Sequence, residues 1–325
     1  MTEVKFWQPA LSYQAHKEEF DAEMQRVLSN GDLILRKDGE TFEESFAKFQ
    51  GRKYAVGVAS GTDALILSMK ALGIGQGDEV ITSSYTFRAT VEAIHHVGAT
   101  PVLADLGEDW STYATTRTAA IIPAHLEGEV VTWHSEEIPV IDDACQAVSA
   151  KMGGIASCYS FYPAKILGCF GDGGAVTTDD ESLYNELKAL RNHYKGDWSK
   201  YAYNSRLDNL QAAVLNVKLK YLPEVLFRRK EIARMYDAEL MNCGLPPQRE
   251  VYQDYVIVHP ARDVLRAYLS VQGVETMANE YPFPAELRKG PMARKYEKNT
   301  LRIPCNENLT DEEVAYVIET INSFV

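Results

Sequence analysis

The stretch SCYSFYPAKILGCFGDGGAVTT, residues 157–178, places Lys165 in a short polar turn that also carries glycines. An apolar run with strand character (residues 159–162) precedes the lysine, and a second run (residues 174–177) follows it. Lysines usually lie on solvated surfaces, so a lysine between two buried-looking strands requires an explanation. Burial lowers the pKa of an amine, and a neutral amine attacks carbonyl carbon. The stretch alone leaves two interpretations open, a Schiff-base lysine and a surface lysine on a hairpin.

Composition and charge limit the class of protein. The chain has 325 residues, of which 46% are hydrophobic and 24% charged, and this is typical of a globular protein of about two domains. The net charge of −13 disfavours nucleic acid as a partner, because phosphate binding needs a basic surface. The five cysteines show no paired metal-ligand spacing, so no metal site is predicted. Without a signal peptide or a membrane-spanning segment, we expect a soluble, cytoplasmic protein with reduced thiols.

Strands and helices alternate along most of the chain. Short apolar strands are expected at residues 54–59, 79–82, 100–103, 118–123 and 139–141, and helices at 64–73 and 86–97 separate the earlier ones. This alternation predicts the α/β class, with a mostly parallel sheet between helices. A long amphipathic pattern, residues 210–236, is interrupted near Pro223 and leads into a smaller α+β domain. We therefore expect a large domain at residues 1–223 and a small one at residues 224–325.

Two helix starts carry capping signals. Residues 41–44 (TFEE) indicate a capping-box-like start for a helix whose apolar stripe includes Phe42 and Phe46. Residues 310–313 (TDEE) indicate the same kind of start for the last helix, residues 309–324. Both helices are expected to pack their apolar stripes into the core.

Polar residues follow the carboxyl ends of several predicted strands, where parallel sheets bind ligands. They are residues 60–62 (SGT), residues 83–87, His125 and residues 142–146. Residues 60–62 suit a phosphate, because free N–H groups and hydroxyl groups meet at a helix N-terminus. Asp143 suits a cationic partner such as a protonated pyridine nitrogen, and Phe87 suits stacking on a flat ring. For each residue alone, a helix N-cap or core packing is the simpler interpretation.

The ordered motifs SGTDAL, GDEVI, YTFRAT, IDDACQA, SFYPAKILG, GDGGA and YNSRLDNLQAAV resemble those of the vitamin-B6-dependent sugar aminotransferases of the DegT/StrS type. These enzymes have the aspartate aminotransferase architecture (fold type I). The resemblance extends from about residue 20 to residue 240 and resumes in the last helix. It implies that Lys165 forms the Schiff base with pyridoxal 5'-phosphate and later moves a proton between substrate and cofactor. It also implies that Asp143 pairs with the pyridine nitrogen.

The resemblance assigns roles to the other candidate residues. Phe87 is expected to stack on the cofactor ring, and Gln146 to contact the ring's hydroxyl side. The phosphate is expected to be held by Gly61, Thr62 and Ser160. Asn204 lies on a loop that in such enzymes reaches the phosphate of the neighbouring subunit. A homodimer with shared active sites is therefore implied.

The function implied by the resemblance is transfer of an amino group from an amino acid, glutamate, to a nucleotide-diphosphate-linked keto-deoxysugar. The setting is deoxysugar, polysaccharide or O-antigen biosynthesis. Related sugar dehydratases carry histidine in place of the lysine, so Lys165 argues against that type. Other elimination or dehydration on a sugar, and a non-catalytic regulator with the same fold, stay open as alternatives. A nicotinamide enzyme is disfavoured because the glycine-rich residues 73–77 follow a helix rather than a strand.

The chain departs from the family pattern in several places. The segment between residues 103 and 141 is shorter than usual, with one helix reduced to residues 107–110 and another to residues 133–137. The segment 279–284 lacks a histidine–tyrosine signature. Cysteine or isoleucine replaces alanine or asparagine at positions 145, 166 and 169. These departures leave the sugar, the aminated carbon and the nucleotide unassigned.

One basic pair is a weak candidate for nucleotide binding. Arg36 and Lys37 could offset the charge of a nucleotide, but a solvated basic pair is the simpler interpretation.

Overall fold

The computed structural model describes residues 3–131, 133, 137–197, 199–284, 287 and 289–324. Its α-helices are α1 (Pro9–Ala15), α2 (Lys17–Asn30), α3 (Lys37–Phe49), α4 (Gly61–Ala71), α5 (Arg88–His96), α6 (Glu181–Leu190), α7 (Asn209–Glu239), α8 (Arg262–Val271), α9 (Pro291–Asn299) and α10 (Asp311–Asn322). The strands are β1 (Tyr54–Val58), β2 (Glu79–Ser83), β3 (Thr100–Ala104), β4 (Thr118–Ile122), β5 (Ile141–Asp143), β6 (Ala156–Ser160), β7 (Gly174–Thr178), β8 (Tyr255–Val258), β9 (Met277–Ala278) and β10 (Thr300–Ile303). Short 3₁₀ turns lie at η1 (Trp110–Tyr113) and η2 (Leu126–Gly128).

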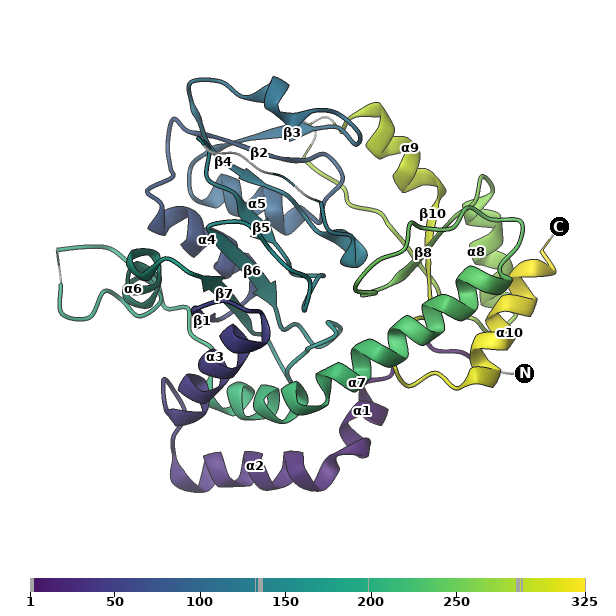
Figure 1. Cartoon of the computed structure of the whole chain (residues 1–325), viewed down its shortest axis with the longest axis horizontal. Helices are drawn as coiled ribbons and strands as arrows, with labels where there is room; N and C mark the ends of the chain where they lie inside the picture. The colour runs from purple at the N-terminus through teal and green to yellow at the C-terminus, as the bar shows by residue number, and fades with distance from the viewer. Residues whose placement is uncertain are drawn as a thin grey trace.

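The larger part of the chain is built on a mixed sheet (Figure 1). One group of strands has the order β1-β7-β6-β5 and another the order β3-β2-β4. Parallel bridges from Ile121 to Val140 and from Ala124 to Asp143 join the two groups edge to edge. Among the described strands of this sheet, β7 alone runs antiparallel to its neighbours, and the other pairings are parallel. The predicted α/β class with a mostly parallel sheet is confirmed.

Alternating side chains of this sheet enter two separate cores. Val56 of β1 and Val176 of β7 pack with apolar residues of α4, α5 and α6. The neighbouring Ala55 and Ala175 pack on the opposite face with α3 and the first half of α7. Strands buried on both faces read as continuous apolar runs, which is why the sequence pattern identified them.

A second lobe is built from the C-terminal part of the chain and the N-terminal segment (Figure 1). Its antiparallel sheet has the order β8-β10-β9 and packs with α8, α10 and the second half of α7. Val4 joins this core and forms a parallel bridge to Val274.

Helix α7 links the two lobes without a break. Its 31 residues include Pro223, and the interruption predicted there is wrong as a helix end. Leu222 packs in the core under the large sheet, whereas Ile232 packs in the second core. The boundary that we propose between residues 223 and 224 therefore lies inside a helix rather than in a linker.

The structure corrects some local expectations. Helix α3 begins at Lys37, so Thr41 lies inside the helix and the capping box predicted there does not form. The capping box predicted at Thr310 and Glu313 is present, with both reciprocal hydrogen bonds. Asp143 is the last residue of β5 rather than the residue after a strand. Helix α9 and strand β10 were not predicted.

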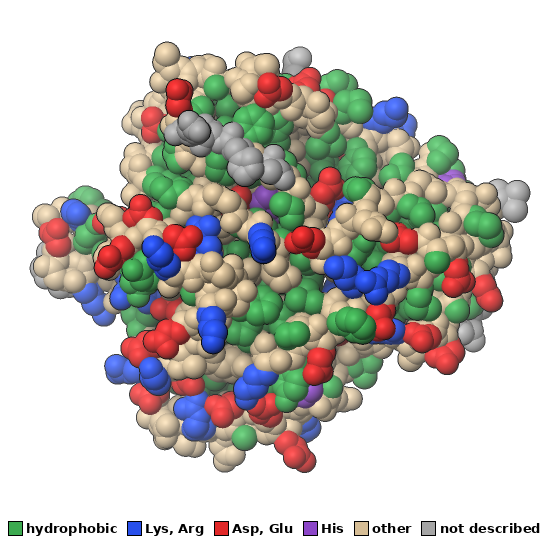
Figure 2. Space-filling model, viewed as in Figure 1, with side chains coloured by type: hydrophobic (Ala, Val, Ile, Leu, Met, Phe, Trp, Pro, Cys, Tyr) green, Lys and Arg blue, Asp and Glu red, His purple; other side chains and the backbone are tan. Residues whose placement is uncertain are grey.

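The described residues of the segment 103–141 contain little helix. In place of the helix expected at residues 107–110, the 3₁₀ turn η1 begins at Trp110. The helix expected at residues 133–137 falls largely on residues 134–136, which lie outside the described residues. Across the ranges that are described, no helix is both long and apolar enough to cross a bilayer. On the face shown in Figure 2, acidic and basic side chains are interspersed.

Candidate active site

A cavity of about 550 Å³ lies between the carboxyl ends of the large sheet and the second lobe. Seven of the eight predicted site residues line it: Gly61, Thr62, Phe87, Asp143, Gln146, Ser160 and Lys165. The eighth, Asn204, is exposed on the loop between α6 and α7, where it bridges to Asn192. Its predicted role in a neighbouring subunit's site stays a prediction.

The start of α4 forms one end of the cavity. Ser60 caps the helix by accepting a hydrogen bond from the Asp63 amide (3.0 Å). At Gly61 a Cβ atom would lie 2.7 Å from Cys145 Sγ and 2.8 Å from Ser160 Cβ, so this position admits only glycine without a shift of its neighbours. The first N–H groups of a helix have no partner within the helix, and they favour an anion. The turn therefore suits a phosphate group.

Asp143 is buried and held at both carboxylate oxygens. Its Oδ2 accepts a hydrogen bond from Thr90 Oγ1 (2.7 Å), and its Oδ1 accepts one from the Cys145 amide (3.3 Å). No cationic side chain forms an ion pair with it within the described ranges. A fixed buried carboxylate without a cation is costly, so the site suits a ligand that brings a positive charge.

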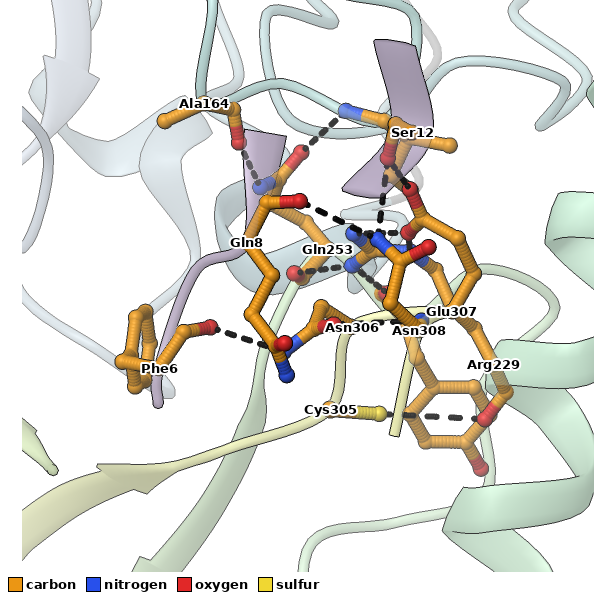
Figure 3. Close-up of polar contacts among 12 residues, drawn as sticks. Phe6, Gln8, Ser12, Ala164, Arg229, Gln253, Cys305, Asn306, Glu307 and Asn308 are labelled. Atoms are coloured by element: carbon orange, nitrogen blue, oxygen red, sulfur yellow. Dashed lines mark hydrogen bonds and ion pairs between the residues drawn. The ribbon is translucent and has the colours of Figure 1, made fainter. Parts of the chain in front are cut away.

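Lys165 occupies a turn that is fastened from the second lobe. The side chain of Gln253 donates from Nε2 to the Ala164 carbonyl (3.0 Å; Figure 3), and its Oε1 accepts from the Ile166 amide (3.2 Å). These two hydrogen bonds lie on either side of Lys165. Burial lowers the pKa of the Lys165 amine, and electrostatic interactions with Cys145, Asp254 and Asp143 oppose this shift only partly. A lowered pKa favours the neutral form of the amine, which is the form that the predicted Schiff-base role requires.

Phe87 is not a core residue, so the simpler interpretation of it was wrong. Its side chain is 50% exposed and lines the cavity. The edge-to-face contact with Tyr281 (centroids 6.0 Å apart) orients the ring. Gln146 is also fixed in place, because its Oε1 accepts from the Glu127 amide (2.7 Å).

Several residues of the cavity were missed by the sequence reasoning. They come from the N-terminal segment and the second lobe: Phe6, Trp7, Gln253, Asp254, Tyr281 and Arg302. Arg302 Nη1 donates to Asp254 Oδ2 (3.0 Å). An arginine within the otherwise apolar strand pattern of β10 was the only available signal.

The basic pair near the third helix does not belong to this cavity. Neither residue lines it. Arg36 pairs with Asp32 (3.6 Å) and Lys37 with Glu40 (3.5 Å), all on the surface. The solvated pair is the correct interpretation within this chain.

Together these residues fit a flat cofactor with an anionic phosphate and a protonated ring nitrogen. The α4 turn suits the phosphate, Asp143 the ring nitrogen, Phe87 the ring face and Lys165 a carbonyl carbon. The fold and the cavity thus define an enzyme of the pyridoxal-phosphate-dependent class. The chain belongs to the DegT/DnrJ/EryC1/StrS aminotransferase family, whose sequence model matches residues 14–322. Aminotransferases of this family depend on pyridoxal phosphate.

Named relatives cover nearly the whole chain. A dTDP-3-amino-3,4,6-trideoxy-alpha-D-glucose transaminase of Streptomyces venezuelae is 35% identical over 99% of this chain and 96% of its own. A UDP-N-acetyl-3-dehydro-alpha-D-glucosamine 3-aminotransferase of Acidithiobacillus ferrooxidans is 33% identical over 96% of both chains. The crystal structure of S. venezuelae DesV in complex with a ketimine intermediate superimposes with a TM-score of 0.91, at 33% identity and full coverage of both chains.

The comparison also bears on chain length. The alignment with the S. venezuelae transaminase has 368 positions and the present chain has 325 residues, so at least 43 positions of the alignment have no residue here. Where these positions fall along the chain is not given by the alignment length, so the shortening expected between residues 103 and 141 stays a prediction.

Proposed function

We propose that this protein transfers an amino group from an amino acid, glutamate, to a keto-deoxysugar carried by a nucleoside diphosphate. The observation that supports this most strongly is the half-buried Lys165, with its lowered pKa, in the same cavity as the Asp143 carboxylate, which forms no ion pair with any described cationic side chain. The names of the relatives support the substrate class. The amino acid becomes a 2-oxo acid and the ketone becomes an amine, so the exchange needs no outside oxidant.

Different residues of the cavity would hold different parts of the cofactor. Gly61, Thr62 and Ser160 would hold the cofactor phosphate, Phe87 the ring face and Gln146 the hydroxyl side. When bound, pyridoxal phosphate supplies an electron sink for charge that develops beside the reacting nitrogen.

Asp143 and Lys165 carry the proton chemistry. Asp143 would keep the ring nitrogen protonated, because its carboxylate is held by Thr90 and pairs with no cationic side chain among the residues that the structure describes. Lys165 would bind the cofactor and, once the donor has displaced it, accept and return the substrate proton at Nζ. Its lowered pKa matches this role, because a protonated amine accepts no proton.

A direct experiment tests the cofactor assignment. Purified protein should absorb in the visible range, and borohydride should fix the cofactor to the peptide that carries Lys165, as read by mass spectrometry. Addition of glutamate should shift the spectrum, and a keto-sugar nucleotide should restore it. A colourless protein that takes up no pyridoxal phosphate contradicts the proposal. A coloured protein that responds to glutamate but aminates no keto-sugar nucleotide would favour the alternative function, elimination on a sugar.

The active form is proposed to be a cytoplasmic homodimer. Asn204 is exposed and stands outside its own cavity, which supports a role in the site of a second copy. The five cysteines are free thiols, as expected in a reducing compartment. Mixing the inactive Lys165→Ala and Asn204→Ala variants should restore activity, because one site of the mixed dimer is then intact. Failure to restore activity rejects the shared site.

A further inference from the structure

The cavity contains a cationic side chain that the cofactor chemistry does not use. The described lining residues with a positive charge are Lys165, Arg229 and Arg302. The hydrogen-bond donors of Arg229 are already in use, because it pairs with Glu307 (2.8 Å) and donates to two backbone carbonyls (2.9 and 3.3 Å; Figure 3). Arg302 differs from it.

Arg302 makes few of the hydrogen bonds that a guanidinium can make. Its Nη1 donates to Asp254 Oδ2 (3.0 Å), and the side chain is only 13% exposed. Its buried Nε has no hydrogen-bond partner within the described part of the chain. Arg52, Arg249 and Arg262 also have a buried Nε without a hydrogen bond, but none of them lines the cavity. Arg302 therefore combines spare donors with access to the site.

The N-terminal segment covers one side of this guanidinium. The Phe6 ring centroid lies 6.0 Å from Arg302 Cζ, within the range of a cation–π contact. Phe6 is itself held at both backbone groups, by Glu275 Oε2 (2.9 Å) and by Asn306 Nδ2 (3.2 Å; Figure 3). With Asp254 on one nitrogen and Phe6 nearby, the orientation of the guanidinium is fixed before any ligand binds.

Arg302 also lies close to the reacting amine. The charges of Asp254 and Arg302 act on the Lys165 amine in opposite directions. Gln253, the residue before Asp254, bonds the turn on both sides of Lys165. In an amino acid, the α-carboxylate is one bond from the carbon whose amino group and proton are exchanged at the lysine. The diphosphate of a nucleotide sugar lies beyond a sugar ring, so the carboxylate is the anion that this location favours.

We propose that Arg302 binds the α-carboxylate of the amino-acid donor, with Asp254 holding the guanidinium in place. This assignment rests on the proposed aminotransferase function. The planar guanidinium offers paired N–H donors that match the two carboxylate oxygens. Every α-amino acid carries this carboxylate, so the proposal does not depend on which donor is preferred.

The test compares two donors in the holoenzyme. The rate of the donor-induced spectral change is measured with L-glutamate and with its 1-amide, in which the α-carboxylate is neutral. The unaltered protein should prefer glutamate by about 100-fold. Arg302→Met should lower the rate with glutamate by about 100-fold and leave the rate with the 1-amide unchanged, so that the preference for glutamate disappears. Arg302→Lys should retain part of it, and the KM for the keto-sugar nucleotide should not change.

Matched variants separate recognition from folding. Arg262→Met removes another buried arginine outside the cavity, whose guanidinium forms an ion pair with Asp263 (2.7 Å), so it should lower thermal stability but keep the preference for glutamate. If Arg302→Met fails to fold, Asp254→Asn replaces it and should reduce the preference by about 10-fold.

Three outcomes overturn the proposal. A preference that survives in the Arg302 variants gives the residue a structural role only. A raised KM for the nucleotide sugar with an unchanged donor rate assigns Arg302 to the diphosphate instead. If no amino acid changes the spectrum of the unaltered holoenzyme, the proposed function itself fails, and that result precedes any comparison of variants.

Discussion

The two walls of the cavity are built in different ways. The sheet wall consists of Ser60, Asp143, Ser160 and Lys165, which end or follow strands of one sheet. The opposing wall consists of Phe6, Gln253, Asp254 and Arg302, which come from the N-terminal segment and the second lobe. The first wall carries the residues that fit the cofactor, and the second fastens the lysine turn and presents a spare cation. With the roles proposed above, reaction type and substrate choice would be encoded in separate parts of the chain.

The largest expected effect is on the sheet wall. Lys165→Ala should lower amino transfer by at least about 10⁴-fold, because both the cofactor attachment and the proton carrier are removed. Lys218→Ala is the matched control. Lys218 is also half-buried with a lowered pKa, but it lies over the Phe170 ring (5.1 Å) outside the cavity. Equal losses in the two variants would show that burial, not position, made the lysine important.

The next effect is expected at Asp143. Asp143→Asn should weaken retention of the cofactor by about 10²- to 10³-fold, as for the loss of one partner of a buried ion pair. Equilibrium dialysis against pyridoxal phosphate measures this. Asp142→Asn serves as the control, since Asp142 accepts hydrogen bonds from the Gly154 amide (2.9 Å) and Ser157 Oγ (3.0 Å). It should lower thermal stability more than cofactor affinity, and the reverse order would contradict the assignment.

A smaller effect is expected for Gln253, the residue of the opposing wall that bonds the Lys165 turn of the sheet wall. Gln253→Leu removes both hydrogen bonds to the lysine turn, at about 1 kcal/mol each, and should slow cofactor attachment about 10-fold. Gln211→Leu is the control, because Gln211 Oε1 bonds the Phe170 amide (2.8 Å) farther along the same loop. Stopped-flow absorbance of apoprotein mixed with pyridoxal phosphate measures the rate. A control variant as slow as Gln253→Leu would remove the special role of Gln253.

The smallest expected effect is a dependence of the free energy of unfolding on pH. The pKa of Lys165 is lowered by burial below its usual 10.5, so the unfolded chain binds a proton that the folded apoprotein does not. The free energy of unfolding is therefore not reduced by this group above pH 10.5. It decreases as the pH falls from 10.5 through the lowered pKa of the folded state. Lys165→Met apoprotein should lack this slope. Urea unfolding of both proteins over the same pH series measures the difference, and parallel curves would contradict the lowered pKa.

The sheet wall was predictable because its signals are local. A strand, a small-residue turn and a helix follow one another around Gly61, and each step is visible within a few residues. Asp143 and Lys165 lie in similarly short patterns. What failed there was detail, such as the end of β5 and the start of α3, because hydrogen-bonded ends depend on neighbouring strands and helices.

The opposing wall could not be predicted because its members meet only in the folded chain. Arg302 belongs to a four-residue strand, in which a single charged side chain indicates a solvent-facing position. Its partner Asp254 lies 48 residues away in the sequence. Asn204 poses a similar difficulty, because its predicted role depends on a contact between two copies of the chain rather than on a contact within one copy.

The contact between Phe6 and Asn306 spans 300 residues of sequence. Synthesis on the ribosome proceeds from the N-terminus, so Phe6 waits for almost the entire chain before its partner emerges. The motifs around Lys165 are complete long before that point. We therefore expect the Lys165 amine to be enclosed by the opposing wall only late in folding, after residue 306 has been synthesised.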